Sequence, residues 1–410
     1  MRTPTGAAAV PVMVPVMVGK AEVKMAVTNS LVRMDLSDAH RVPPPSYLYN
    51  PGVQTAASSS RRLYIDWARG VAVLLMIEAH TIDAWTRLRD KQLLAYGYGT
   101  VLGGFAAPMF LWLAGLGVAM SMARSYARTG SRQTALHAAT IRGVEVFLLA
   151  FLFRLQAFMV SPGSHPVTLF RVDVLNVMGP AMVAAGLLWA AASQTWTRVA
   201  TFAIVAILIA LVTPIVRASA SVDLLPLWFQ WYVRPAGEFT TFTMLPWSGF
   251  VFAGAAVGVL IASTTGARRL HAVLGVVGVL MIAGGLYAAS RPSIYTVPVN
   301  FWTSSPTFFA VRVGILMVVL AALSFVPRFA ALEPLAALGR ASLFVYWIHV
   351  ELVYGYASWL WRHRLPLWAW AIGYLAFTLL IYRAIGLRDR FLANRRGRGS
   401  IPAPLSVSQA

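Results

Sequence analysis

The chain has 410 residues, of which 58% are hydrophobic and 12% are charged, about half the charged fraction of a soluble domain. Its net charge of +20 comes mostly from Lys and Arg in short loops between apolar runs, which is typical of membrane topology signals and not of nucleic-acid binding. The absence of cysteine excludes disulfides, thiolate nucleophiles and Cys-ligated metals.

The apolar runs are about 20 residues long and show no two-residue alternation. Only helices and closed barrels satisfy their backbone polar groups in lipid, and runs of this length and period select helices. The sequence therefore predicts an all-α integral membrane protein, a polytopic bundle of about ten transmembrane helices.

Three regions follow one another along the chain. Residues 1–60, rich in Pro, Ala, Val and Ser, are predicted to be a disordered tail, and residues 391–410 a disordered basic tail. Residues 61–390 form the membrane domain. The segment 222–240, rich in Trp, Tyr and Pro, suits an interfacial or re-entrant element and would add an eleventh helix. The predicted spans are 63–85, 99–123, 141–160, 172–192, 198–216, 242–263, 270–289, 308–326, 341–361 and 367–385.

Most of the 34 basic residues fall on one side of these ten spans, together with both ends of the chain. Because Lys and Arg concentrate in cytoplasmic loops, both termini are predicted to be cytoplasmic, in a multi-pass protein of the cell inner membrane. Asp66 and Arg69 then lie in the inner half of the first span. His80 lies about 21 Å further out along the same helix.

The first span, "RLYIDWARGVAVLLMIEAH" (62–80), carries ionisable residues that are costly in lipid. Asp66, Arg69 and His80 fall within one arc of about 60°, and the spacing of the first two predicts an ion pair. Glu78 and Asp83 point elsewhere. His80 either bonds a neighbouring helix or lines a polar cavity, where a neutral imidazole suits general-base chemistry.

Further polar residues are predicted near the outer surface. In "FRVDVLN" (170–176), Asp173 and Asn176 lie three residues apart, with Arg154 and Arg171 at similar depth. This set either binds a hydroxyl-rich or phosphorylated ligand or consists of a helix N-cap with snorkelling arginines.

Two later stretches add candidates. "LPWSGF" (245–250) has the composition of a helix break that lines a cavity. In "RASLFVYWIHVELVYG" (340–355), Ser342, Tyr346 and His349 share one face, so His349 either positions an acceptor or bonds a carbonyl. The seven histidines are scattered without an HExxH pattern, so no metal site is expected.

An Asp-x-x-Arg-Gly entry followed by an apolar run and His80 is similar to the first helix of integral-membrane acyltransferases. The chain most resembles the bacterial branch of the heparan-alpha-glucosaminide N-acetyltransferase catalytic-domain family, over roughly residues 61–390. The Arg-Gly-to-His spacing is shared with the broader acyltransferase-3 group. Other similar segments are "APMFLWLAGLGVAMSMAR" (107–124), "RGVEVFLLAFLFRLQAF" (142–158), "LFRVDVLNVMGPA" (169–181), "LPWSGFVFAGAAVG" (245–258) and "LGRASLFVYWIHVELVYG" (338–355).

The resemblance implies transfer of an acetyl or other acyl group from cytosolic acyl-CoA to a hydroxyl or amine of a glycan-like acceptor at the far face. His80 maps onto the candidate base and Arg69 onto the family's arginine, with Asp66 as its partner. A direct transfer and an acyl-histidine intermediate both remain open without cysteine. Expected substrate-binding residues are His349, Tyr346, Arg154, Asp173 and Asn176.

Two alternatives remain open on the sequence. The first is a transporter or flippase of a small or lipid-linked polar solute, with the buried charges as a relay. The second is a non-catalytic glycan-binding relative. Expected partners are membrane lipids, acyl-CoA and the acceptor, with no nucleic acid and no metal cofactor; a dimer stays open.

Overall fold

The computed structural model describes residues 62–160, 165–264 and 266–398. These residues form helices joined by turns, with two isolated parallel bridges and no β-strand among them. The predicted all-α class is therefore confirmed. The predicted tail 1–60 and residues 399–410 lie outside the described residues.

The helices are the following, in chain order. The longer ones are α1 (Leu63–Trp85), α3 (Ala106–Thr129), α4 (Arg132–Val160), α5 (Val174–Ala191), α6 (Thr195–Ala218), α8 (Met244–Ser263), α9 (Ala267–Ala289), α10 (Pro306–Phe325) and α13 (Leu367–Arg398). The shorter α-helices are α2 (Leu94–Gly103), α7 (Leu227–Val233), α11 (Glu333–Arg340) and α12 (Ser342–Tyr354). The 3₁₀ turns are η1 (Leu88–Gln92), η2 (Pro166–Phe170), η3 (Ala220–Leu224), η4 (Gly237–Phe239), η5 (Ala330–Leu332) and η6 (Tyr356–Ser358).

Within the described part of the chain, 8 helices are long and apolar enough to cross a membrane, or 9 if the bent pair α11–α12 is one span. This agrees with a polytopic membrane bundle. α1 is 23 residues long but is not among them, because it carries Asp66, Arg69, Glu78 and Asp83. The predicted number of ten or eleven spans is not confirmed.

The structure corrects three predicted boundaries. The single span predicted at 341–361 is a helix that ends at Tyr354, and it is bent by 76° from the helical segment before it. The segment 222–240 holds only the seven-residue α7 between two 3₁₀ turns. α13 continues to Arg398, so the first residues of the predicted basic tail are helical.

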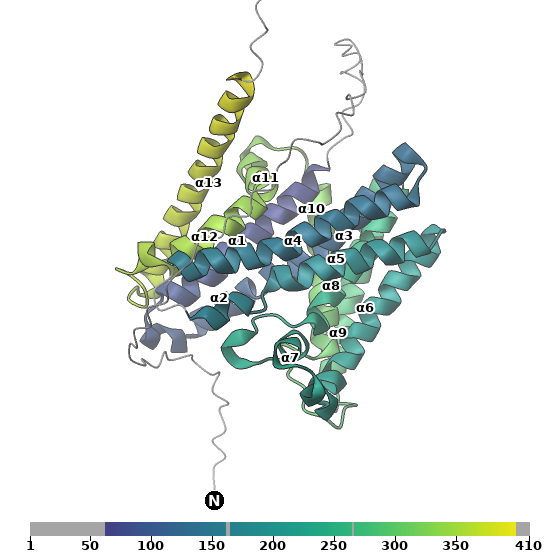
Figure 1. Ribbon diagram of the computed structural model, residues 1–410, viewed down its shortest axis with the longest axis horizontal. Coiled ribbons are helices and arrows are strands. Elements are labelled where there is room, and N and C mark those ends of the chain that lie inside the picture. The colour runs from purple at the N-terminus through teal and green to yellow at the C-terminus, as the bar shows by residue number, and fades with distance from the viewer. Residues whose placement is uncertain (1–61, 161–164, 265, 399–410) are drawn as a thin grey trace, which may run out of the picture. The chain divides into compact units, whose positions relative to one another are not determined.

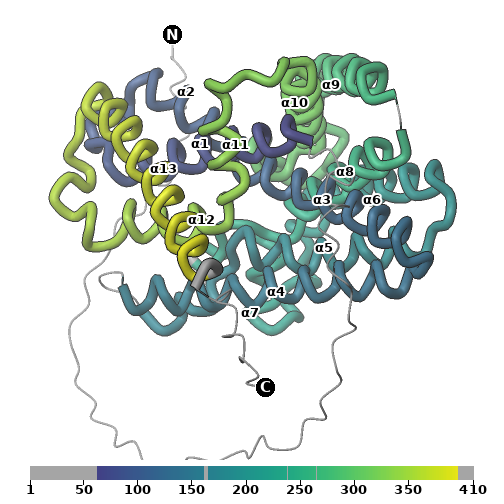
Figure 2. The backbone as a smooth tube through the Cα atoms, turned by 90° about the horizontal axis from the view of Figure 1, so that it is seen from above, coloured from purple at the N-terminus to yellow at the C-terminus, as the bar shows by residue number. Residues whose placement is uncertain are grey.

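α1 packs against α2, α3, α11, α12 and α13, which makes it the central element of its half of the bundle (Figure 1). The pair α4–α5 and the pair α9–α10 lie at opposite edges (Figure 2). Most of α1 is buried, including Ala72 and Val73, which are 0% exposed. Asp66, Glu78 and Thr81 on α1 are likewise buried, so these polar side chains are held against protein.

Glycines allow α11 to approach α1 closely. A Cβ atom at Gly339 would lie 1.9 Å from the Asp66 carbonyl oxygen, and one at Gly70 would lie 2.1 Å from the Leu335 carbonyl oxygen. Such distances are far below a van der Waals contact, so both backbones touch only because neither glycine has a side chain. This contact fixes where the following helix, α12, meets the outer half of α1.

We expect Gly339→Ala to destabilise the protein by about 1–3 kcal/mol, because the methyl group must displace the α1 backbone. The measurement is the thermal midpoint of the purified protein in detergent. Gly284→Ala on α9 is the matched control, since no atom lies within 4 Å of its Cβ position. Equal midpoints for the two variants would contradict the close α1–α11 contact.

The C-terminal end of α1 is tied to the start of α13. Thr86 pairs with Leu365, and Asp90 accepts hydrogen bonds from the Arg87 Nε at 2.8 Å and the Leu367 backbone N–H at 3.1 Å. The Arg87 hydrogen bond is the main reason that the pKa of Asp90 is lowered. A lowered carboxyl pKa means that this tie is lost only when the pH falls through that pKa, so it persists at neutral pH.

Candidate functional site

His80 and His349 face each other between α1 and α12. His80 Nδ1 lies 2.8 Å from His349 Nε2, and the two rings are nearly parallel, with an interplanar angle of 6°. His349 is 0% exposed, whereas His80 is only partly buried. The pair therefore has one fully enclosed imidazole and one that is partly exposed.

Backbone carbonyls determine which nitrogen of each ring carries the proton. His349 Nδ1 lies 2.8 Å from the Val345 carbonyl oxygen and 3.1 Å from that of Tyr346. A carbonyl oxygen only accepts, so His349 Nδ1 must carry hydrogen, and in the neutral ring Nε2 is left as an acceptor. His80 Nδ1–H then donates to His349 Nε2, which leaves the lone pair of His80 on Nε2.

This arrangement follows the logic of a catalytic triad. A partner on Nδ1 fixes the tautomer and orientation of a histidine, so that its Nε2 is ready to accept a proton. Here the partner is a neutral imidazole in place of a carboxylate. The Val345 carbonyl oxygen orients His349, and His349 in turn orients His80. This chain of hydrogen bonds can therefore position His80 as a general base within a membrane helix.

Tyr354 covers another side of His80. Its ring lies 5.7 Å from the His80 ring in an edge-on arrangement, and its hydroxyl donates to Asp83 Oδ2 at 3.1 Å. Lys91 Nζ donates to Asp83 Oδ1 at 3.1 Å. Asp83, which the helical arc excluded, thus lies close to the histidine pair through Tyr354.

A second polar group extends from His349 through Tyr346. The Tyr346 ring centroid lies 6.1 Å from that of His349, and its hydroxyl donates to Asp173 Oδ2 at 3.3 Å. Arg154 Nη2 donates to the same oxygen at 2.5 Å. The Asp173 and Asp83 carboxylates are both within electrostatic range of His80.

Asp173 is also the N-cap of α5. Its Oδ1 accepts the Val174 backbone N–H at 2.7 Å, and its own N–H donates to Asn176 Oδ1 at 2.9 Å, which completes a capping box. The N-cap interpretation is thus confirmed. The Asp173 carboxylate already accepts three donors, so it positions Tyr346 and Arg154 and has little capacity left for a ligand.

We expect Asp173→Ala to lower stability by about 0.5–2 kcal/mol through the lost cap alone, with a further loss because the partly buried Arg154 keeps no carboxylate. Asp173→Asn restores the cap but not the charge, so it separates the two losses. The measurement is the thermal midpoint of both variants. A raised KM with unchanged midpoints would instead indicate that Asp173 binds substrate.

The structure brings together six of the eight predicted site residues: His80, His349, Tyr346, Arg154, Asp173 and Asn176. Asp66 lies about 21 Å and Arg69 about 16 Å away from His80 along α1. Their ion pair is present at 4.0 Å, with the Asp66 side chain 5% exposed and that of Arg69 36%. The Arg69 guanidinium passes over Gly117 of α3, where a Cβ atom would lie 3.4 Å from Nη2.

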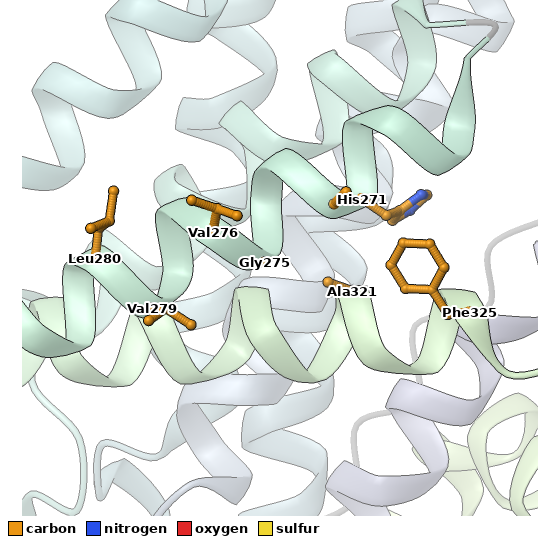
Figure 3. A pocket seen from close by; sticks show the side chains of 8 residues that line it. His271, Gly275, Val276, Val279, Leu280, Ala321 and Phe325 are labelled. Atoms are coloured by element: carbon orange, nitrogen blue, oxygen red, sulfur yellow. The ribbon is translucent and has the colours of Figure 1, made fainter.

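A groove on the surface of α9 and α10 is separate from this cluster (Figure 3). It has a volume of about 370 Å³ and is lined almost entirely by apolar side chains, among them Leu280, Val276 and Phe325, with His271 at one end. Such a lining suits lipid contact and offers no set of groups for acyl transfer. Elsewhere in the described ranges, no group of three His, Asp or Glu side chains is placed to hold a metal ion.

The sequence left His349 as a residue that either positions an acceptor or bonds a carbonyl; the carbonyl contact is confirmed, and the pairing with His80 was not predicted. The shared face of Ser342, Tyr346 and His349 was a correct signal that the face is polar. No local signal could reveal the partner, because the two histidines are 269 residues apart in the chain.

No curated protein matches this chain. The family model of the acyltransferase-3 group, described as an acyltransferase domain, matches residues 62–385. That range covers most of the chain. It contains the six site residues that lie together (His80, His349, Tyr346, Arg154, Asp173 and Asn176) as well as Asp66 and Arg69. The chain therefore belongs to the acyltransferase-3 family of membrane acyltransferases.

Proposed function

We propose that this protein moves an acetyl or other acyl group from acyl-CoA to a hydroxyl or amine of a glycan-like acceptor, with His80 as the general base. The observation that carries the proposal is the His80–His349 pair, in which backbone carbonyls fix the tautomers so that His80 Nε2 is left unprotonated. The family resemblance supplies the donor and acceptor classes.

In the proposed reaction, His80 Nε2 takes the proton of the acceptor O–H or N–H as the oxygen or nitrogen attacks the thioester carbonyl carbon. The resulting imidazolium keeps its Nδ1–H bonded to His349, and this hydrogen bond becomes charge-assisted. When the C–S bond breaks, His80 returns the proton to the CoA thiolate. The reaction therefore starts and ends with the same neutral histidine pair.

The remaining cluster residues are proposed to hold the acceptor. Arg154 uses one terminal nitrogen on Asp173 and keeps further N–H groups for acceptor oxygens. Tyr346, between His349 and Asp173, supplies a wall on which a sugar ring can lie. Arg69, with Asp66, is proposed to meet the polar part of the CoA at the cytoplasmic end of α1.

The transporter alternative predicts two gated vestibules related by an internal repeat, and the sequence shows no repeat. The family match likewise does not favour transport. The acyltransferase proposal is therefore the one to test first.

The test uses the full-length protein in detergent with radiolabelled acetyl-CoA and a panel of glycan, glycolipid and amine acceptors. We expect label to pass to at least one acceptor, with release of free CoA. A parallel sample without acceptor is quenched and separated by size, since label on the protein would indicate an acyl-histidine intermediate. No labelled product from any acceptor class, in a preparation that still binds acetyl-CoA, would contradict acyl transfer.

A further inference from the structure

Arg312 is a buried guanidinium with no anionic partner among the residues that the structure describes. It lies six residues inside α10, about 9 Å from the start of the helix. The residue is 9% exposed, and its Nε atom is enclosed without a hydrogen-bond acceptor. Among the described residues the terminal nitrogens have no hydrogen-bond acceptor, and they are not fully enclosed as Nε is.

Aromatic rings compensate this charge only in part. The Arg312 guanidinium lies 4.2 Å from the Phe308 ring centroid and 5.5 Å from that of Trp247. Rings attract a cation by their faces but cannot accept its N–H groups as an oxyanion does. Arginine does not escape the cost of burial by losing its proton, because its intrinsic pKa is too high.

A second arginine adds to the positive charge at the same place. Arg217, in the last turn of α6, donates to the Leu245 carbonyl oxygen at 2.7 Å and to Thr243 Oγ1 at 2.5 Å. Both acceptors are neutral, so the charge of Arg217 is not cancelled. The contacts of Arg217 with Leu245 and of Arg312 with Trp247 place two cations at the beginning of α8.

The beginning of α8 is itself electropositive. Leu245 has a non-helical backbone, which is the break predicted from "LPWSGF", so the regular helix starts after it. The first backbone N–H groups of a helix have no partner within the helix and favour an anion there. Two guanidiniums thus contact the first residues of α8, with no carboxylate within ion-pair distance of either arginine in the described ranges.

We propose that this junction of α6, α8 and α10, built on Arg312, Arg217 and the start of α8, is a binding site for a phosphate group. The phosphate belongs either to a lipid headgroup or to a soluble phosphate ester. A guanidinium group can donate two parallel hydrogen bonds to two phosphate oxygens, and the short distance of Arg312 from the start of α10 suits a headgroup at the membrane surface. The site is independent of the proposed acyl transfer.

The test measures retention of phosphatidic acid and of phosphatidylcholine by the full-length protein, after delipidation in detergent, by native mass spectrometry. We expect wild type to retain phosphatidic acid preferentially and Arg312→Gln to reduce its affinity about tenfold. Arg312→Lys keeps the charge and should retain more than Arg312→Gln. Arg291→Gln is the matched control, because Arg291 also lies over a ring, that of Tyr287 at 4.6 Å, but in an exposed position.

In a second set of samples, inorganic phosphate or CoA is added to the protein, and the thermal midpoint of unfolding is measured. A soluble phosphate is the ligand if two results are found together. Either compound must raise the thermal midpoint of wild type and of Arg291→Gln but not that of Arg312→Gln, and wild type must show no selective retention of phosphatidic acid. If Arg312→Gln does not fold, Arg217→Gln is measured in the same way. The proposal is overturned if the arginine variants retain phosphatidic acid and respond to phosphate and CoA as wild type does.

Discussion

Replacement of His80 by Ala is expected to lower kcat for acyl transfer by about 10²- to 10⁴-fold. The acceptor proton then has no base, since the other imidazole of the pair, His349, has its Nδ1 bonded to a backbone carbonyl and is 0% exposed. The measurement is the rate of labelled acetyl transfer to the acceptor found in the panel. KM for acetyl-CoA should change little, because His80 lies about 16 Å along the helix from Arg69.

His137→Ala is the matched control for this substitution. His137 is exposed on α4 and makes no contact with the histidine pair, so its loss should leave kcat unchanged. A His80→Ala enzyme that transfers acyl groups at the wild-type rate would eliminate His80 as the base and leave the family assignment intact.

Replacement of His349 by Leu is expected to lower kcat by about 10- to 100-fold with little change in KM. Leucine fills the enclosed site but cannot accept the His80 Nδ1–H, so His80 loses the partner that fixes its tautomer and orientation. His349→Gln offers an amide oxygen near the former Nε2 and should recover most of the rate. The measurement is kcat and KM for the acceptor in both variants.

The pair of variants separates positioning from binding. If His349 binds the acceptor, as the sequence suggested, both substitutions should raise KM while kcat stays near wild type. If His349 is merely part of the packing, Leu and Gln should differ in thermal midpoint and not in kcat. A kcat that recovers with Gln, at similar midpoints for both variants, is the result that the geometry predicts.

The sequence located the first helix well. The predicted span 63–85 coincides with Leu63–Trp85, and the helical arc placed His80 correctly on a protein-facing side. The same helical geometry predicted that Glu78 points away from the face of His80. The structure places the Glu78 carboxyl away from the histidine pair, against Gly99 and Gly103 of α2. These predictions succeeded because they depend only on the 3.6-residue repeat of one helix.

Prediction failed where a helix ends or bends. The span predicted at 341–361 is apolar throughout, yet the chain breaks between α11 and α12 by 76° and α12 ends at Tyr354. The break follows the contact of Gly339 with the α1 backbone. Hydropathy does not register such a contact, because the glycine matters through the space that it leaves for a distant segment.

The sequence by itself determined that the chain is a helical membrane protein, that no cysteine chemistry operates in it, and that α1 carries ionisable groups on a face turned from lipid. Only the tertiary structure decided which partner each group has: His349 for His80, the α5 N-cap and Arg154 for Asp173, and, among the described residues, aromatic rings for Arg312. The physical reason is that helical periodicity is local, whereas a partner is set by packing between segments far apart in the chain. That packing gives a partly buried histidine a hydrogen-bond partner and a defined tautomer.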